Sequence, residues 1–224
     1  MTNPRGDGAQ PRPDPALRLT DEAMGDTETF RVAGIVLAAG ASRRMGSSTN
    51  KLLLEIDGEP IVRRAVRRAI EAGLEPVVIV TGHEPLRVRD ALDGLECQFV
   101  DNPDFTGPTS TSLHAGLRAL DASVPAALVM LGDMVHVTSA MLRALSDSVR
   151  SGRAPLAVSR YGAESVLAPP LVFSRTLWPE LLALVGEGGG KAVAMAHLHD
   201  AAVHAWPAEA LRDIDTPADY DAVR

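Results

Sequence analysis

The sequence predicts an α/β protein with a doubly wound, mostly parallel sheet of the Rossmann-like type. Short apolar runs alternate along the chain with segments of helical periodicity, which is typical of parallel strands buried on both faces. Gly40, Gly82 and Asp133 directly follow three of these runs. Because ligands on such sheets bind outside the carboxyl ends of the strands, these three residues mark the expected site.

The first half of the chain predicts three strands and two helices. Residues 30–39 form the first apolar run, and residues 52–56 are apolar before a turn at Asp57-Gly58. A helix beginning at Pro60 and ending at Gly73 is expected. Its apolar face consists of Ile61, Ala65, Val66, Ala69 and Ile70. Buried strand 76–81, helix 85–93 and short strand 97–100 follow.

The second half repeats this rhythm without repeating the sequence. Residues 126–131 are the third strong buried strand and run into Gly132-Asp133. The other expected elements, in order, are a helix at 110–121, a helix at 138–150, a strand at 156–159, an apolar stretch at 170–173, helices at 175–184 and 189–197, a strand at 201–206 and a short helix after Pro217.

The length of 224 residues favours one domain, predicted to span residues 30–224, and 46% hydrophobic residues suffice for its core. Residues 1–29 are rich in proline, glycine and charge, which predicts a disordered tail.

With a formal net charge of −7, nothing suggests a broad nucleic-acid-binding surface, and no stretch is apolar enough to span a bilayer. We therefore expect neither a nucleic-acid nor a membrane partner. A single cysteine, Cys97, excludes an internal disulfide and a multi-cysteine metal site, and suits a reducing cytoplasm.

The strongest functional signal is the loop LAAGASRRMG at residues 37–46, with Lys51 beyond it. Small residues at 38–41 let a nucleotide approach the backbone, whose free amides can hold phosphate oxygens. Arg44 and Lys51 are suited to neutralising a phosphate chain. The spacing fits neither the P-loop nor the dinucleotide fingerprint. An ordinary strand-to-helix turn with exposed cations is the alternative interpretation.

This loop resembles LA[AG]GxSxRMG followed by Lys, the signature of the MobA-like NTP transferases that modify the molybdenum cofactor. Ala39 places it nearest to the molybdenum cofactor cytidylyltransferases, since the guanylyl branch usually has Gly there. The resemblance runs from about residue 32 to the C-terminus. It also rests on the segments KLLL at 51–54, GEP at 58–60, TGH at 81–83, NP at 102–103, STSL at 110–113, LGD at 131–133 and DIDTPADY at 213–220.

The resemblance implies a Rossmann-like nucleotidyltransferase fold and a role for each matching residue. Arg44, Lys51 and Asp133 would be catalytic, with Arg44 and Lys51 on the triphosphate. Asp133 and Asp215 would ligate Mg²⁺, which prefers hard oxygen ligands. The residues implied to hold the nucleotide are Leu37, Ala38, Ala39, Gly40, Arg44, Lys51, Gly82, Asn102, Ser110, Thr111, Ser112 and Asp133.

Several of these positions have plainer alternatives. Asp133 suits a turn, Asp215 suits a cap of the helix after Pro217, and Asn102 with the Ser-Thr-Ser run suits a turn and helix start. His136 and Lys191 are candidates for contacting the acceptor, although Lys191 also suits a plain helix-start loop. His83 and His114 are expected to be surface or hydrogen-bonding residues.

The implied reaction transfers NMP from an NTP, by the resemblance CTP, to molybdopterin or its molybdenum-loaded form, with a molybdoenzyme or its chaperone as a further partner. The alternatives are another phosphorylated acceptor, such as a sugar or polyol phosphate, and a non-catalytic nucleotide-binding or cofactor-delivery protein. Three departures from the family pattern concern the substrates and the phosphate loop: Val135 replaces a usual Pro, Pro108-Thr109 replaces Gly-Met, and Lys51 lies farther from Gly46.

Overall fold

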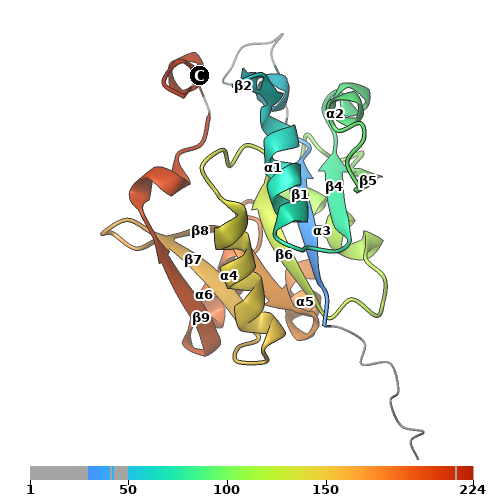
Figure 1. The fold of residues 1–224 in the computed structure, drawn as a ribbon. Helices are drawn as coiled ribbons and strands as arrows, with labels where there is room; N and C mark the ends of the chain where they lie inside the picture. Colours follow the sequence, from blue (N-terminus) through green and yellow to red (C-terminus); the bar gives the residue numbers. More distant parts are fainter. Residues whose placement is uncertain (1–29, 41, 43–49, 215, 224) are drawn as a thin grey trace, which may run out of the picture.

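The fold is built on a seven-stranded sheet with the strand order β5-β4-β1-β6-β8-β7-β9 (Figure 1). A computed structural model describes residues 30–40, 42, 50–214 and 216–223. Among the described strands of this sheet, only β8 runs antiparallel to its neighbours, β6 and β7. The strands are β1 (Val32–Ala38), β4 (Val77–Thr81), β5 (Gln98–Asp101), β6 (Ala126–Leu131), β7 (Leu156–Tyr161), β8 (Val166–Ser174) and β9 (Ala201–Trp206).

Helices cover both faces of this sheet, which confirms the predicted doubly wound α/β class. Side chains of β1 alternate between two hydrophobic clusters: Val32 and Val36 enter one, and Ile35 and Leu37 enter the other. The first cluster includes α1 (Ile61–Glu71) and α4 (Ser139–Arg150), in front of the sheet in Figure 1. The second includes α3 (Thr109–Ala119), α5 (Trp178–Leu182) and α6 (Lys191–Ala196).

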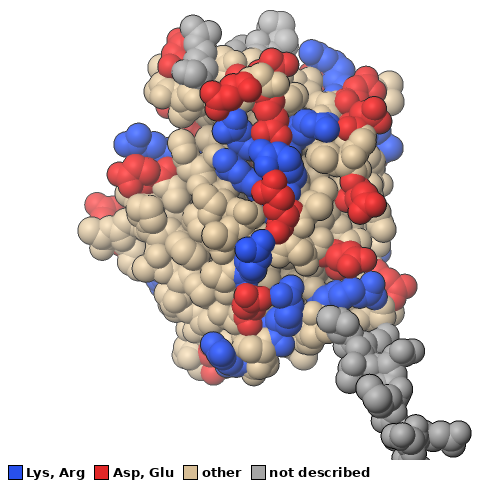
Figure 2. Space-filling model, viewed as in Figure 1, with Lys and Arg blue, Asp and Glu red and all other residues tan. Residues whose placement is uncertain are grey.

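Helix α1 separates an apolar face from a charged one. Pro60 caps its start and Gly73, with φ +76°, follows its end, as predicted. The buried residues are Ile61, Val62, Ala65, Val66 and Ala69, while Ile70 is half-buried. Its outer face carries arginines paired with neighbouring carboxylates, and Figure 2 shows this mixture of charges over α1.

The antiparallel strand β8 enters the sheet through a hairpin. Only four residues separate Tyr161 from Val166, and Gly162 and Ser165 in this turn adopt φ values of +64° and +55°. A parallel connection needs about a dozen residues or more, so a link this short forces β8 back against β7.

Two small features lie between β1 and α1 along the chain. The predicted Asp57-Gly58 turn joins β2 (Glu55–Ile56) to β3 (Glu59–Pro60), with φ +54° and +78° at its two residues. The short helix η2 (Lys51–Leu53) precedes it, where an apolar run was expected. The remaining elements are α2 (Pro85–Ala91), η3 (Arg175–Leu177), η4 (Leu198–Asp200), η5 (Ala208–Leu211) and α7 (Pro217–Asp221).

Three predictions fall outside the described residues: the tail at 1–29, Arg44 and Asp215. Their proposed roles stay predictions.

Candidate functional site

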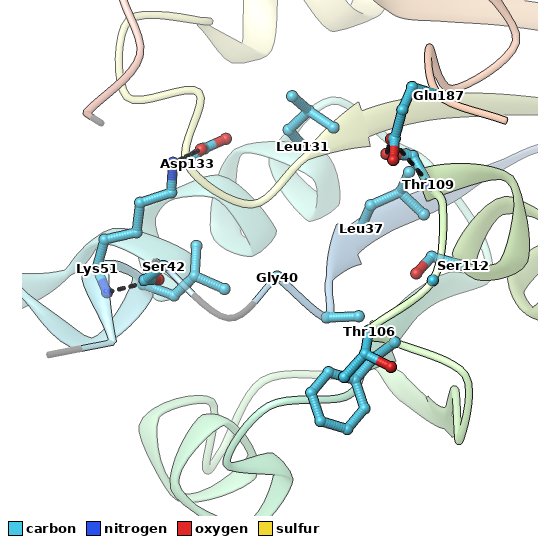
Figure 3. Close-up of a pocket in the computed structure, with 14 residues that line it drawn as sticks. Leu37, Gly40, Ser42, Lys51, Thr106, Thr109, Ser112, Leu131, Asp133 and Glu187 are labelled. Carbon is cyan, nitrogen blue, oxygen red and sulfur yellow. Dashed lines mark hydrogen bonds and ion pairs between the residues drawn. The ribbon is translucent and has the colours of Figure 1, made fainter. Parts of the chain in front are cut away.

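A cavity of about 410 Å³ lies where β1 and β6 end and α3 begins (Figure 3). Its volume is in the range of small-molecule sites. The carboxyl ends of parallel strands meet at this edge, which is where the sequence placed the site. The lining residues are Leu37, Ala39, Gly40, Ser42, Lys51, Leu52, Phe105, Thr106, Gly107, Thr109, Ser112, Leu131, Asp133 and Glu187.

The loop after β1 forms one wall of this cavity. Among the described residues, apart from its chain neighbours, a Cβ atom added to Gly40 would meet no atom within 4 Å, so the glycine leaves its backbone open to a ligand. Leu37 and Ala39 line the same wall, whereas Ala38 ends β1, is buried and does not line the cavity. Ser42 Oγ accepts a hydrogen bond of 3.1 Å from the backbone N–H of Lys51.

Lys51 and Asp133 meet at one side of the cavity. Lys51 Nζ lies 2.5 Å from Asp133 Oδ2, and the two side chains are only 15% and 11% exposed. Lys51 begins η2, and Asp133 follows β6, so the pair joins two loops at the same edge of the sheet. Figure 3 shows the pair on the side of the cavity opposite Glu187 and Thr109.

Asp133 also offers an unused oxygen. Its Oδ1 is buried and has no hydrogen-bond partner among the described residues. A buried carboxylate oxygen without a partner is costly, and a bound cation would satisfy it. The two oxygens of Asp133 can therefore serve two groups, with Oδ2 bound to Lys51 and Oδ1 left for a cation.

In the described part of the chain, no cluster of three or more His, Cys, Asp or Glu side chains could enclose a metal. A site with so few protein ligands is compatible with Mg²⁺, which commonly binds one or two carboxylates and takes its other ligands from phosphates and water. Asp133 can supply one carboxylate, and the second candidate, Asp215, lies outside the described residues.

Most of the predicted base- and ribose-binding polar groups are occupied within the protein. Asn102 is buried, and its Nδ2 donates to Thr111 Oγ1 and Ser112 Oγ at 2.9 and 3.0 Å. Its Oδ1 accepts from the N–H of Asp104 at 3.0 Å. Ser110 is bonded to the backbone of Gly186. Asn102 thus ties the loop after β5 to the start of α3, and only Ser112 of this group lines the cavity.

Gly82 acts on the cavity through packing. A Cβ atom at Gly82 would lie 2.3 Å from Phe105 Cβ and 2.9 Å from Ala39 Cβ, so only glycine lets Phe105 sit where it lines the cavity. Sequence reasoning did not find Phe105, because this contact joins two loops across the sheet edge and no local pattern announces it.

The far side of the cavity is closed by Glu187, also missed as a site residue. Its Oε2 accepts hydrogen bonds from the backbone N–H and the hydroxyl of Thr109 at the start of α3. These bonds hold the pKa of the Glu187 carboxyl below its ordinary value. A helix-start loop was the plain alternative that the sequence offered at Lys191, but the contact of Glu187 with α3 joins distant segments and leaves no local pattern.

The two predicted acceptor contacts do not line the cavity. His136 is half-buried beyond Asp133, and its pKa is lowered by burial first and then by the cations of Arg68, Arg212 and Arg64. Lys191 is exposed at the first residue of α6. Both stay predictions for a larger acceptor that extends past the cavity.

No helix in the described ranges combines the length and the apolar character needed to cross a membrane.

Comparison with curated proteins finds partial relatives. The bifunctional protein GlmU of Anaeromyxobacter dehalogenans is 33% identical over 138 residues, which cover 60% of this chain and 28% of that protein. The GlmU of Kineococcus radiotolerans is 35% identical over 147 residues, covering 65% of this chain and 29% of that protein. The chain thus matches less than a third of the length of these relatives.

Solved structures match more of the chain. The structure of Rv0371c from Mycobacterium tuberculosis H37Rv has a TM-score of 0.75 and 28% sequence identity, covering 87% of this chain and 97% of that one. Rv0371c is also known in complex with manganese. A CMP:2-keto-3-deoxy-manno-octonic acid synthetase complexed with CTP shares the fold, with a TM-score of 0.66 and 16% identity over 86% of this chain and 96% of that one.

The family model described as MobA-like NTP transferase domain matches residues 34–202, which include the loop after β1, Lys51 and Asp133. That span is more than half of the chain, and the mostly parallel sheet agrees with it. The chain therefore belongs to the MobA-like NTP transferase family, a family of nucleotidyltransferases.

Proposed function

We propose that this protein transfers CMP from CTP to a phosphorylated acceptor, with molybdopterin or the molybdenum cofactor as the acceptor, and that it uses Mg²⁺. The observation that carries this proposal is the Lys51–Asp133 pair, in which a buried carboxylate keeps one oxygen without a partner beside an open glycine backbone. A reducing cytoplasm is the expected location, because the single cysteine offers no internal disulfide.

In this reaction an oxygen of the acceptor phosphate attacks the α-phosphorus of CTP. The bond from the α-phosphorus to the bridging oxygen breaks, and the electron pair leaves with pyrophosphate. No covalent enzyme intermediate is needed, so catalysis consists of in-line positioning and charge stabilisation. A bound Mg²⁺ would neutralise charge on the phosphates.

The described residues divide these tasks along the cavity. The backbone at Gly40 is open to the nucleotide, and Lys51 supplies a cation held in place by Asp133 Oδ2. Asp133 Oδ1 would bind the metal ion. On the other side, Phe105, Thr106 and Ser112 would bound the base and ribose. Arg44 and Asp215 keep their proposed roles on the triphosphate and the metal.

The choice of CTP rests on the resemblance and on Ala39. Ala39 lines the cavity at a position where the guanylyl branch usually has glycine. Its methyl group narrows the cavity, and a narrower cavity favours a pyrimidine base over a larger purine. Ala38 adds nothing to this steric argument, because its side chain is buried at the end of β1.

Pyrophosphate release tests the proposal. The protein would be incubated with Mg²⁺, each of CTP, GTP and ATP, and one acceptor from molybdopterin, sugar phosphates and polyol phosphates. We expect release only with CTP and molybdopterin or its molybdenum-loaded form, and none in excess EDTA. Release with a sugar or polyol phosphate would instead assign the alternative acceptor. Tight nucleotide binding without release for any acceptor would identify a binding or cofactor-delivery protein.

A further inference from the structure

The turn that carries Asp133 is buried and tightly bonded. Between β6 and α4, Asp133, Met134, Val135 and Val137 are all buried. The N–H of Gly132 donates to Leu37 O at 3.0 Å, and the N–H of Val135 donates to Asp133 O at 2.9 Å. The turn is thereby anchored to the end of β1 on one side and folded onto itself at Asp133.

Arg68 binds the other side of this turn from helix α1. Its Nη1 donates hydrogen bonds to Val135 O at 2.6 Å and to Val137 O at 2.7 Å. The guanidinium is half-buried. Hydrogen bonds from a charged donor are stronger than neutral ones, and two acceptors on one nitrogen fix the orientation of both peptide groups.

These contacts lead to the backbone of Asp133. Arg68 holds the carbonyl of Val135, and the N–H of Val135 holds the carbonyl of Asp133. We propose that Arg68 is a positioning residue, which fixes the backbone of Asp133 so that its carboxylate stays at the cavity and can bind the divalent cation through Oδ1. This inference rests on the proposed function only in taking Asp133 as the metal ligand.

The same helix offers a matched control. Arg63 Nη1 also donates to two carbonyls, Ala91 O at 3.0 Å and Asp93 O at 2.8 Å, where α2 ends. Neither acceptor lines the cavity. Replacing Arg63 therefore removes the same kind of contact from the same helix without touching the Asp133 turn.

The test is Mn²⁺ affinity, measured from the electron paramagnetic resonance signal of free Mn²⁺ in titrations of the full chain. Wild type, Arg68→Met, Arg63→Met, Asp133→Asn and Arg68→Met combined with Asp133→Asn are compared, with thermal unfolding of each. Residues that orient metal ligands typically contribute about 10–100-fold in affinity. We expect Arg68→Met to weaken Mn²⁺ binding about tenfold or more and Arg63→Met to change it less than twofold.

The double variant shows whether Arg68 acts through Asp133. We expect Arg68→Met to have no further effect on Mn²⁺ affinity once Asp133 is Asn, because Arg68 is proposed to act only through the Asp133 carboxylate. If Arg68→Met does not fold, Arg68→Lys keeps a cationic donor and should still weaken Mn²⁺ binding severalfold, while keeping the fold.

Two results would overturn the inference. In the first, the folded Arg68 variants bind Mn²⁺ as wild type does, so that Arg68 serves only stability. In the second, Asp133→Asn leaves Mn²⁺ affinity unchanged, so that no metal is held there to be positioned. Neither result depends on turnover, so failure of nucleotidyl transfer is recognised separately, by the absence of pyrophosphate release from wild type.

Discussion

Lys51 Nζ lies 2.5 Å from Asp133 Oδ2 and joins the segment after β1 to the segment after β6. Only one of the two Asp133 oxygens is used in this contact. A largely buried pair of this kind orders both side chains before a ligand arrives, which is the preorganisation that phosphate chemistry requires.

Asp133→Asn should lower the rate of pyrophosphate release at least 10²-fold, because an amide is a poorer ligand for a hard cation and a weaker partner for Lys51. Circular dichroism should show an unchanged fold. Asp147→Asn is the matched control, since Asp147 lies on α4, its side chain is 55% exposed, and its Oδ1 pairs with Arg150 Nη1 at 2.7 Å. Equal activity of Asp133→Asn and Asp147→Asn would remove Asp133 from the mechanism.

Two glycine substitutions should have different effects, one on nucleotide binding and the other on the stability of the fold. Gly40→Ala should leave the melting temperature unchanged and weaken nucleotide binding, because Gly40 lines the cavity and the new methyl group meets no atom of the described residues beyond its chain neighbours. Gly82→Ala should destabilise the fold by about 1–3 kcal/mol, because the new Cβ lies 2.3 Å from Phe105 Cβ. Denaturant unfolding and nucleotide titration separate the two effects. A stable Gly82→Ala variant with normal nucleotide affinity would contradict the packing of Phe105 described above.

Ala39→Gly should raise the kcat/KM for GTP more than it lowers the kcat/KM for CTP, because removing the methyl group widens the cavity near Phe105. Steady-state kinetics with CTP, GTP and ATP, in wild type and variant, would measure this. A wild-type preference for GTP or ATP would refute both the steric argument and the cytidylyl assignment, while leaving nucleotidyl transfer intact.

A chain shortened to begin at Phe30 should fold and react as the full chain does, because residues 1–29 lack a core-forming pattern. Melting temperature and pyrophosphate release of the two chains would be compared. A large loss in either would show that the first 29 residues contribute to the 30–224 domain.

Periodicity was sufficient to predict most of the sheet. The bounds of β6 follow from its apolar run, since a strand buried on both faces has little freedom in composition. The antiparallel direction of β8 was not predicted, because hydrophobic patterns carry no strand direction and only the short turn after Tyr161 decides it.

The sequence could indicate those site residues that belong to short local motifs. Gly40, Lys51 and Asp133 follow directly from the loop and the strand ends, and the structure brings all three to one cavity. Phe105, Glu187 and Arg68 depend on contacts between distant segments, such as the bonds from Arg68 to the carbonyls of Val135 and Val137. Backbone acceptors of this kind leave no mark on the residue type, so sequence reasoning had no signal for them.

The most direct test of the central claim follows the fate of the two ends of CTP. Wild type and Lys51→Ala would be incubated with Mg²⁺, molybdopterin and CTP labelled with ³²P at the α- or the γ-phosphate. We predict that the α-label moves to the acceptor and the γ-label to pyrophosphate. We expect Lys51→Ala to be slower by about 10²–10³-fold, the usual effect of losing one donor that stabilises transition-state charge. Transfer of the γ-label to the acceptor, or failure of the α-label to reach any phosphorylated acceptor, would contradict nucleotidyl transfer at this site.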